Sequence, residues 1–204
     1  MPKILVLAGS TRRESLNRKL AAVAAGVCRE AGAEVTHIEL ADYPMPLFSE
    51  DLEAAEGTPD SAMALKQLFR EHDGFVITCP EYNSSITPLL KNTIDWLSRR
   101  AEGEAPLVAY KGKTAALLSA SPGALGGLRG LVHVRSILGN IGVLVMPAQV
   151  AVSSAARAFA EDGSLADDKV AGRVRAALFD LVETTSKIAS DGRQPHPDLS
   201  IRRS

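Results

Sequence analysis

The sequence predicts one α/β domain with three layers, in which a parallel sheet of five strands, ordered 2-1-3-4-5, lies between two layers of helices. Short apolar runs recur along the chain, and three of them are continuous rather than alternating, which is typical of strands buried on both faces. Helix-like stretches separate the runs, and this alternation is typical of right-handed βαβ crossovers. A length of 204 residues suits a single domain with a sizeable core.

Five apolar runs are the expected strands. The second run, at residues 34–40, alternates apolar and polar side chains more cleanly than the others, so we expect it at an edge of the sheet, where one face is less covered. That edge position suits the order 2-1-3-4-5. In chain order the runs are KILVLAG (3–9), EVTHIEL (34–40), GFVITCP (74–80), KTAALLSAS (113–121) and GVLVMPAQVAV (142–152).

Five further stretches are expected to be helices, and they cover residues 15–31, 61–72, 87–100, 127–142 and 167–190. Residues 41–60 are expected to form a long polar loop, because prolines there exclude a regular element through it. The domain is expected to cover residues 1–190. Residues 191–204 contain two prolines and little apolar material, so we expect a disordered tail or one whose structure depends on a partner.

The composition excludes several classes of function. A formal net charge of -1 argues against a dedicated nucleic-acid binder or a membrane-surface protein. No apolar run approaches the ~20 residues of a membrane span, and the N-terminal stretch lacks the apolar core of a signal peptide, so a cytoplasmic location is expected. Cys28 and Cys79 lie in apolar stretches without a CxxC motif, as expected of buried residues in a reducing compartment. No histidine pair has metal-ligand spacing, so no metal site is expected.

Polar loops follow the first, third and fourth expected strands, and in this topology they meet at the ligand-binding edge of the sheet. The first loop, GSTRRESLN (9–17), leads from a strand into a helix, where unpaired amides and the helix dipole form an anion site. Hydroxyl, amide and guanidinium donors in it would suit a phosphate: Ser10, Thr11, Ser15, Asn17 and either Arg12 or Arg13. An equally good interpretation of this stretch alone is that Ser15 is only a helix N-cap and that the arginines are solvated.

Neither a G-x-x-x-x-G-K-[ST] loop nor a G-x-G-x-x-G loop is present, which excludes the usual NTPase and dinucleotide motifs. The expected ligand is therefore a mononucleotide-type phosphate at an α/β switch point. No Ser-His-Asp or Cys-His constellation can be assembled from the sequence. Trp96 is expected in the core or in a subunit interface, and His133 is interpreted as a packed or interfacial residue rather than a general base.

Taken together, GSTRRESLN (9–17), PEYNSSITPLLKNTIDWLSR (80–99) and SASPGALGGLRG (119–130) resemble the flavodoxin-like NAD(P)H-dependent FMN reductases, a family that includes bacterial quinone, azo and chromate reductases. The resemblance runs from Lys3 to about Ile188. It implies that the FMN phosphate is bound by Ser10, Arg12, Ser15 and Asn17. It implies that the isoalloxazine ring is lined by Pro80, Glu81, Tyr82 and Asn83, with Ser84 close by. It implies that the flavin is approached from the third loop by Ser119, Ser121 and Gly123.

The resemblance further implies FMN as cofactor and NADPH or NADH as co-substrate, used in a ping-pong cycle in which nucleotide and acceptor occupy one site in turn. Quinones, azo compounds, metal oxyanions or free flavin would accept the electrons, and the chain would form a homodimer or homotetramer. No residue is assigned as catalytic, since the flavin carries the redox chemistry; Asn83 and Tyr82 are the first places to look. The alternative is a non-enzymatic electron carrier or flavin-dependent sensor, although electron carriers that dock on basic partners are usually strongly acidic. Hydrolysis of another phosphate ligand is the weakest interpretation.

Overall fold

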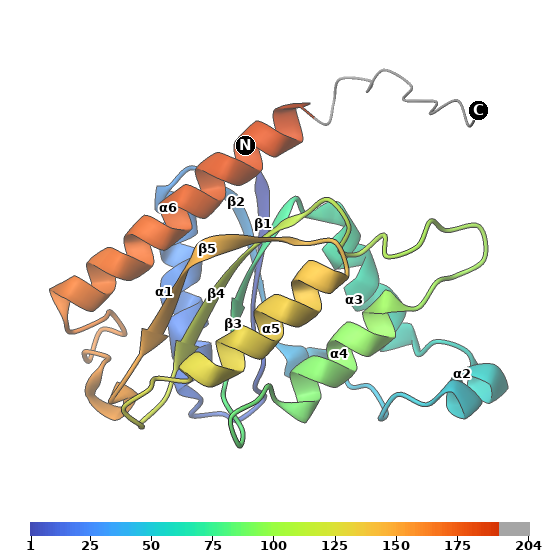
Figure 1. Cartoon of the computed structure of the whole chain (residues 1–204), viewed down its shortest axis with the longest axis horizontal. Helices are drawn as coiled ribbons and strands as arrows, with labels where there is room; N and C mark the ends of the chain where they lie inside the picture. The colour runs from blue at the N-terminus through green and yellow to red at the C-terminus, as the bar shows by residue number, and fades with distance from the viewer. Residues whose placement is uncertain (192–204) are drawn as a thin grey trace, which may run out of the picture.

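Five parallel strands form one sheet in the order β2-β1-β3-β4-β5 in the computed structural model, which describes residues 1–191 (Figure 1). The predicted order is confirmed, and it is the order of flavodoxin-like folds. β1, β3 and β4 are buried almost throughout, whereas β2 has mostly half-buried residues, as expected for the edge strand. The strands are β1 (Lys3–Ala8), β2 (Glu34–Ile38), β3 (Gly74–Thr78), β4 (Thr114–Ala120) and β5 (Leu144–Val152).

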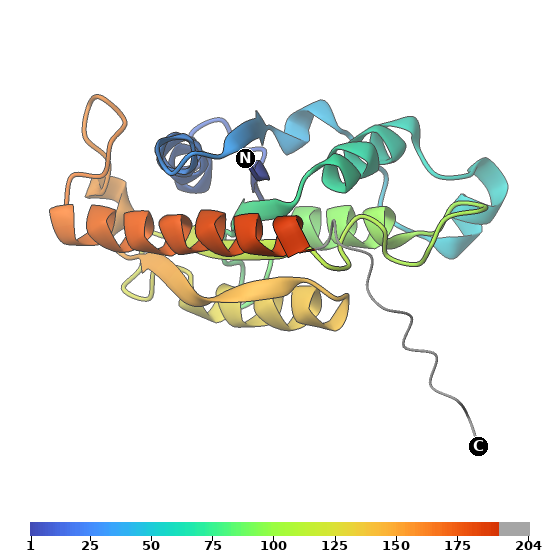
Figure 2. The ribbon, with the colours of Figure 1, turned by 90° about the horizontal axis from the view of Figure 1, so that it is seen from above.

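Helices cover both faces of the sheet (Figure 2). On one face α1 (Leu16–Glu30) and α6 (Asp168–Asp191) pack over side chains such as Ile4 and Val6. On the other face three helices pack over Leu5 and Phe75, and these are α3 (Asp60–Glu71), α4 (Pro88–Ser98) and α5 (Leu128–Asn140). Neighbouring strand residues point to opposite faces, so continuous apolar strands give the molecule two cores, one on each side of the sheet.

The prediction that residues 41–60 contain no regular element is wrong. Leu40–Asp42 forms a short 3-10 helix, and Glu50–Glu56 forms the helix α2. The prolines lie on either side of α2 rather than within it, so they do not interrupt its hydrogen bonds. Ser49 caps α2 by accepting a hydrogen bond from the amide of Leu52, and acidic residues fill the first turn, where the helix dipole favours them.

Trp96 belongs to the core and is fully buried. Its indole Nε1 donates to the carbonyl of Pro46 at 2.8 Å, and its ring meets the ring of Phe48 edge to face. These contacts anchor the 40–48 segment to α4. Cys28 and Cys79 are also buried, which confirms the expectation, and burial raises the pKa of both thiols.

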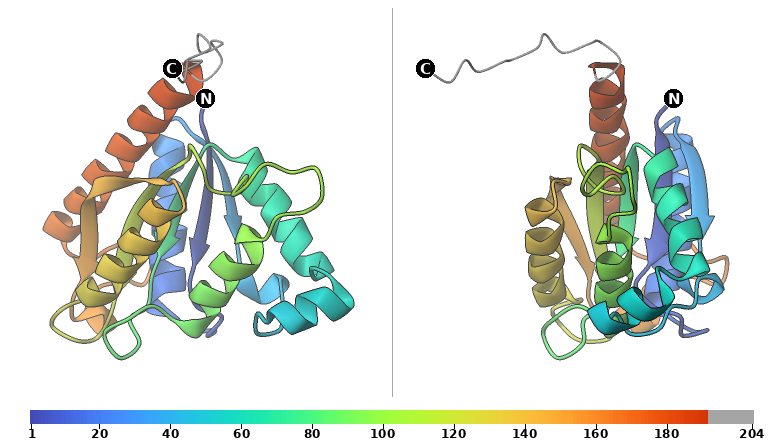
Figure 3. Two further views of the ribbon diagram at one scale, coloured as in Figure 1. Left: turned by 45° about the vertical axis from the view of Figure 1, so that its right-hand side comes forward. Right: turned by 90° about the vertical axis from the view of Figure 1, so that its right-hand side faces the viewer.

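The predicted tail, residues 191–204, lies outside the described residues apart from Asp191, which ends α6. Among the helices of residues 1–191, none is long and apolar enough to cross a membrane. The loops that follow β1, β3 and β4 gather at one end of the sheet, at the bottom of the left view in Figure 3. The fold therefore brings together the three segments in which the sequence predicts a site.

Candidate functional site

A cleft of about 130 Å³ lies at the carboxyl ends of the central strands. Its walls come from the loops after β1, β3 and β4, the three segments in which a site is expected. Residues predicted for the site and found in these walls are Ser10, Arg12, Ser15, Asn17, Pro80, Glu81, Tyr82 and Ser121. Four other predicted residues do not line the cleft, namely Asn83, Ser84, Ser119 and Gly123.

The first loop places the N-terminus of α1 at this cleft. Ser15 is the N-cap of α1, and its Oγ accepts a hydrogen bond from the amide of Arg18 at 3.4 Å. The cap interpretation of Ser15 is therefore confirmed, and the same residue also lines the cleft. The first amides of a helix have no partner within it and carry its positive dipole end, so this wall attracts an anion.

Two arginines of the loop behave differently. Arg12 is exposed and lines the cleft, whereas Arg13 is exposed but lines none of the hollows near it. A third arginine, Arg18, supports the loop from behind. Its Nε forms an ion pair with Glu39 at 2.7 Å, and its Nη1 donates to the carbonyls of Arg12 and Arg13 at 3.4 Å. No local pattern in the sequence marks Arg18, because Glu39 reaches it only once β2 lies beside β1.

Asn17 joins the first loop to the third. Its Nδ2 donates to the carbonyl of Ala120 at 2.9 Å, and its Oδ1 accepts from the amide of Ala120 at 3.0 Å. The side chain is buried and still borders the cleft. Asn17 thus links α1 to the end of β4, and its second Nδ2 hydrogen is the donor left for a ligand.

The second loop ends in a tight turn whose outer residues are Tyr82 and Ser85. Each of these two donates its amide to the carbonyl of the other at 3.0 Å. The central residues Asn83 and Ser84 have φ angles of 50° and 68°, as a type I′ turn requires, and asparagine tolerates that region well. Tyr82 is 55% exposed and offers the cleft one flat aromatic side chain. The turn explains Asn83 structurally, and its contact with a flavin stays a prediction.

The carboxylate of Glu81 is engaged with α5. Arg129 donates to its Oε1 through Nε at 2.9 Å and Nη2 at 2.7 Å, and the amide of Gly130 donates to Oε2 at 3.2 Å. Partial burial works to raise the pKa of Glu81, but the hydrogen bonds from Arg129 and Gly130 outweigh it, and the net pKa is lowered. A flavin contact of Glu81 would therefore fall on its backbone.

His133, one helical turn after Arg129 in α5, contacts the 82–85 turn of the second loop. Its Nδ1 lies 2.8 Å from Oγ of Ser85, and the residue is exposed rather than packed in the core. Packing of His133 in the core is thus excluded, and its place in an interface stays a prediction. Together Arg129, Gly130 and His133 hold the second loop against the N-terminal half of α5.

In the third loop, the structure shows what Ser119 and Gly123 do within the chain. Ser119 is fully buried and donates its Oγ to the carbonyl of Gly126 at 2.6 Å, so it shapes the loop and does not face the cleft. Within the chain, a Cβ at Gly123 would meet only Oγ of Ser121, at 3.7 Å, and the approach of its backbone to a flavin stays a prediction. Gly126 and Gly127 are the positions of this loop that require glycine, because their φ angles are 62° and 91°. Two consecutive glycines are the feature of the sequence that indicates such a backbone.

Two threonines fix the loops to one another and were also missed. Thr87, the N-cap of α4, donates its Oγ1 to the carbonyl of Gly9 at 2.9 Å. Thr78 donates its Oγ1 to the carbonyl of Asn17 at 2.8 Å. Both side chains are buried, so these hydrogen bonds tie the first loop to the end of β3 and to the start of α4.

The donors in the cleft fit an FMN phosphate. Hydroxyls of Ser10 and Ser15, the guanidinium of Arg12 and the N-terminus of α1 surround one region, and this set suits a phosphate dianion. A neighbouring hollow of about 350 Å³ shares Ser10, Arg12 and Tyr82 with the cleft, which leaves room for a larger ligand. Within residues 1–191 no group of three His, Cys, Asp or Glu side chains could hold a metal ion.

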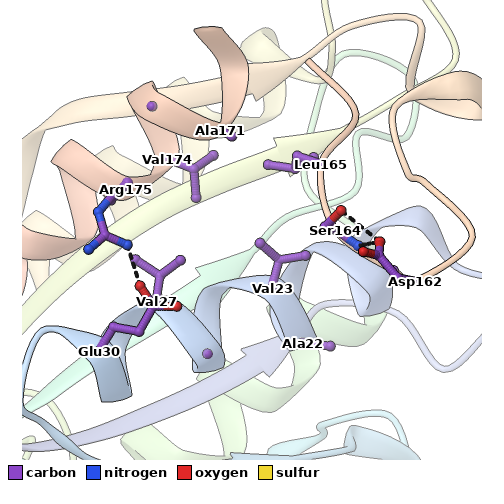
Figure 4. A pocket seen from close by; sticks show the side chains of 13 residues that line it. Ala22, Val23, Val27, Glu30, Asp162, Ser164, Leu165, Ala171, Val174 and Arg175 are labelled. Atoms are coloured by element: carbon purple, nitrogen blue, oxygen red, sulfur yellow. Dashed lines mark hydrogen bonds and ion pairs between the residues drawn. The ribbon is translucent and has the colours of Figure 1, made fainter. Parts of the chain in front are cut away.

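An apolar hollow of about 520 Å³ lies elsewhere, between α1, α6 and the 162–165 loop (Figure 4). Val23, Val27 and Val174 line it, and the ion pair of Glu30 with Arg175 lies at one end. None of the predicted site residues reaches it. The residues predicted for the site therefore line the smaller cleft and not this hollow.

Residues 2–157 match the sequence model of a family described as "NADPH-dependent FMN reductase". The chain is 33% identical over 196 residues to a probable NADPH:quinone oxidoreductase of Oryza sativa subsp. japonica, covering 91% of this chain and 93% of the relative. It is 38% identical over 170 residues to an NAD(P)H-dependent FMN reductase of Pseudomonas aeruginosa, covering 82% and 86%. A solved flavoenzyme NAD(P)H:(acceptor) oxidoreductase from Paracoccus denitrificans superposes with a TM-score of 0.78 at 29% identity, covering 92% of this chain and 98% of that one.

Proposed function

The chain belongs to the NADPH-dependent FMN reductase family, and from this premise we propose that it binds FMN in the cleft and transfers two electrons from NADPH or NADH to a small acceptor. The observation that carries the proposal is that phosphate donors and an aromatic wall meet in one cleft at the ends of β1, β3 and β4. Bound FMN would supply the redox chemistry, because a flavin can take up a hydride and release electrons to varied acceptors.

The residues of this chain bind FMN and orient its ring. Ser10, Ser15 and Arg12, with the N-terminus of α1, hold the phosphate. Tyr82 and Pro80 border the ring, and the backbone amides of Glu81, Asn83 and Ser84, with the carboxamide of Asn83, are its proposed hydrogen-bond donors. No side chain is assigned a proton transfer. Catalysis then rests on fixed geometry and on preorganised donors, both of which can lower a barrier substantially.

A quinone is the proposed acceptor, because relatives in this family carry the name quinone oxidoreductase or quinone reductase. The overall reaction balances as NADPH + H⁺ + quinone giving NADP⁺ + hydroquinone, with two electrons and two protons reaching the quinone. Azo compounds, metal oxyanions and free flavin are further proposed acceptors. No observation on the structure favours an electron carrier over an enzyme.

The experiment that tests this function is spectroscopic. The protein is incubated with FMN, freed of excess ligand and then mixed anaerobically with NADPH. Flavin absorption bands that stay with the protein and bleach on adding the nucleotide are the expected result. A colourless protein, or a coloured one that NADPH does not bleach, would overturn the proposal.

Arg12→Ala is expected to weaken FMN binding roughly ten- to hundredfold, because charge-assisted hydrogen bonds contribute about 1.5–3 kcal/mol. Riboflavin, which lacks the phosphate, should bind the variant and the wild type equally. Arg13→Ala is the matched control, since Arg13 is exposed and does not line the cleft, and it should change either affinity less than twofold. Titration of flavin fluorescence measures the affinities of both ligands for the wild type and the two variants, and equal losses of FMN affinity in the two variants would contradict this role of Arg12.

We further propose that the chain forms a homodimer or homotetramer through α5. Leu125, Leu128 and Val132 are 50%, 46% and 56% exposed, and exposed apolar residues that gather on one face often mark an interface. The α4 helix is a poorer candidate, because Trp96 is buried and Arg99 is paired with Glu53.

Sedimentation tests this interface. The wild type is expected to sediment above the 21.6 kDa of one chain, and Val132→Glu should shift it to that mass. Met63→Glu, at a 49% exposed position of α3, is the control and should leave the mass unchanged. A wild type that sediments only at 21.6 kDa at micromolar concentration would exclude the oligomer.

A further inference from the structure

The helix α5 begins beside the second loop and has no cap of its own. Its N-cap residue, Gly127, offers no side-chain hydrogen bond, and its first turn contains no acidic residue. The second loop supplies the missing anion, because Oε2 of Glu81 accepts a hydrogen bond at 3.2 Å from the amide of Gly130 in that first turn. A carboxylate at this place satisfies an unpaired amide and is attracted by the helix dipole. Glu81 therefore caps α5 from a position 49 residues earlier in the chain.

The same contact packs α5 directly on the backbone of the second loop. A Cβ at Gly130 would lie 3.2 Å from the carbonyl oxygen of Ser85 and 3.4 Å from the Cβ of Glu81, so a larger residue would crowd the loop. One helical turn later, Nδ1 of His133 lies 2.8 Å from Oγ of Ser85. The backbone that carries the proposed hydrogen-bond donors to the flavin ring is thus held against α5.

The contact also places two opposite charges beside the proposed ring wall. Arg129 donates to Oε1 of Glu81 from Nε at 2.9 Å and from Nη2 at 2.7 Å. The pKa of Glu81 is lowered, so its carboxylate is ionised at neutral pH. The side chain of Glu81 is only 9% exposed and that of Arg129 is 57% exposed, and Glu81 lines the cleft whereas Arg129 does not. Water screens a nearly buried charge poorly, so the charge of Glu81 is balanced mainly by Arg129 and by the N-terminus of α5.

We propose that Glu81 and Arg129 are positioning residues that adjust the reduction potential of the bound flavin. Glu81 fixes the ring-wall backbone to α5, and Arg129 cancels the negative charge that this carboxylate brings close to the ring. The inference rests on the proposed function, because it requires a flavin in the cleft.

The charges of the pair predict shifts of opposite sign. A reduced flavin ring is negatively charged at neutral pH, whereas the oxidised ring is neutral, so charges near the ring change its potential. Without Arg129, the carboxylate of Glu81 would disfavour the reduced ring and lower the potential. Without the charge of Glu81, the guanidinium and the helix dipole would favour the reduced ring and raise the potential. A purely structural role would loosen the loop in both cases and would give no reason for opposite signs.

The test measures the midpoint potential of the flavin in the full-length protein at saturating FMN, by anaerobic reduction with dithionite in the presence of a reference dye. Glu81→Gln removes the charge but leaves the amide of Gly130 an oxygen that can accept its hydrogen bond. Arg129→Gln removes the cation at a side chain that is 57% exposed, so the core is not disturbed. Arg129→Lys retains the cation, and the double variant Glu81→Gln/Arg129→Gln removes both charges.

A matched pair for control is Glu53 with Arg99. Arg99 donates from Nε to Oε1 of Glu53 at 2.9 Å, and its Nη2 lies 2.7 Å from Oε2, so the geometry resembles that of the pair under test. Neither residue lines the cleft. Glu53→Gln and Arg99→Gln should both leave the potential at the wild-type value.

Glu81→Gln is expected to raise the potential and Arg129→Gln to lower it, each by about 15–30 mV. This corresponds to a roughly three- to tenfold change in the ratio of the affinities for reduced and oxidised FMN, at about 30 mV per tenfold for two electrons. The double variant and Arg129→Lys should both lie closer to the wild type than Arg129→Gln does.

Shifts of the same sign in Glu81→Gln and Arg129→Gln, the absence of a shift in either, or equal shifts in the control variants would overturn the inference while the proposed function stands. If Glu81→Gln does not retain FMN, the comparison of Arg129→Gln with Arg129→Lys decides, and equal potentials in these two would overturn the inference. A wild type that takes up no FMN, or whose flavin is not bleached by NADPH, would overturn the inference together with the proposed function.

Discussion

Asn17→Asp is expected to cost FMN affinity roughly a hundredfold at neutral pH, because two unit charges about 6 Å apart repel by about 3 kcal/mol at an effective dielectric constant of about 20. The carboxylate would border the proposed phosphate seat, since Asn17 lines the cleft. It would also deprive the carbonyl of Ala120 of the donor that Nδ2 provides at 2.9 Å. The side chain is only 4% exposed, so water cannot take the place of that donor.

The stability of this variant should depend on pH with a definite sign. Burial and the lost donor raise the pKa of the introduced carboxyl above the ~3.9 of an unfolded aspartate. Its neutral form can donate to Ala120 as the carboxamide does, so the deficit relative to wild type should be small near pH 4. The deficit should grow as pH rises through the raised pKa of the folded state.

Asn17→Ala separates the effect of the added charge from the effect of the lost hydrogen bonds to Ala120. It adds no charge but leaves the amide and carbonyl of Ala120 without partners, which should cost about 3 kcal/mol and roughly 6–12 °C in Tm for a domain of this size. That loss should be the same at every pH. Denaturant unfolding of both variants between pH 4 and pH 8 measures these differences, and identical, pH-independent losses would contradict the account of Asn17.

The order of the sheet could be predicted because it follows from local pattern. A continuous run such as residues 3–9 indicates a buried strand, and the polar loops 9–17, 80–88 and 119–130 are found at the ends of three of the five runs. The topology then brings these loops to one edge, as the structure shows. Ser15 was predicted as a cap or a ligand: it is the N-cap of α1 and it lines the cleft, and its contact with a phosphate stays a prediction.

Contacts between distant elements could not be predicted in the same way. Asn17 meets Ala120 across 103 residues, and Glu81 meets Arg129 across 48; neither pair has a local signature. The family resemblance implied Ser119 as a flavin neighbour, whereas in the structure its side chain is buried and donates to the carbonyl of Gly126. The helix α2 was not predicted, because the prolines of residues 41–60 were taken to exclude a helix anywhere in the segment, whereas all of them lie outside residues 50–56.

Gly126→Ala is expected to destabilise the fold by about 2–4 kcal/mol, the combined cost of a positive φ for a residue with a Cβ and of a clash that must be relieved. A Cβ at Gly126, whose φ is 62°, would lie 2.8 Å from the amide nitrogen of Ser153 and 2.8 Å from the carbonyl carbon of Val152. These are backbone atoms that follow or end β5, so no side-chain rotation can make room. Thermal unfolding should show the loss directly.

Gly123→Ala is the matched control within the same loop. Its φ is not positive, and the added Cβ would meet only Oγ of Ser121 at 3.7 Å, so its Tm should stay within about 2 °C of wild type, as for surface changes of about 0.5 kcal/mol or less. FMN titration then distinguishes a change in the conformation of the loop from the loss of a direct contact between the loop and FMN. If Gly126→Ala moves the loop that carries Ser121, it should weaken FMN binding and also lower stability. Gly123→Ala should weaken FMN binding only if the flavin approaches the backbone of residue 123, as the family resemblance implies. Equal Tm values for the two variants would show that the loop can shift away from β5, and the positive φ at Gly126 would then not be what shapes the third wall of the cleft.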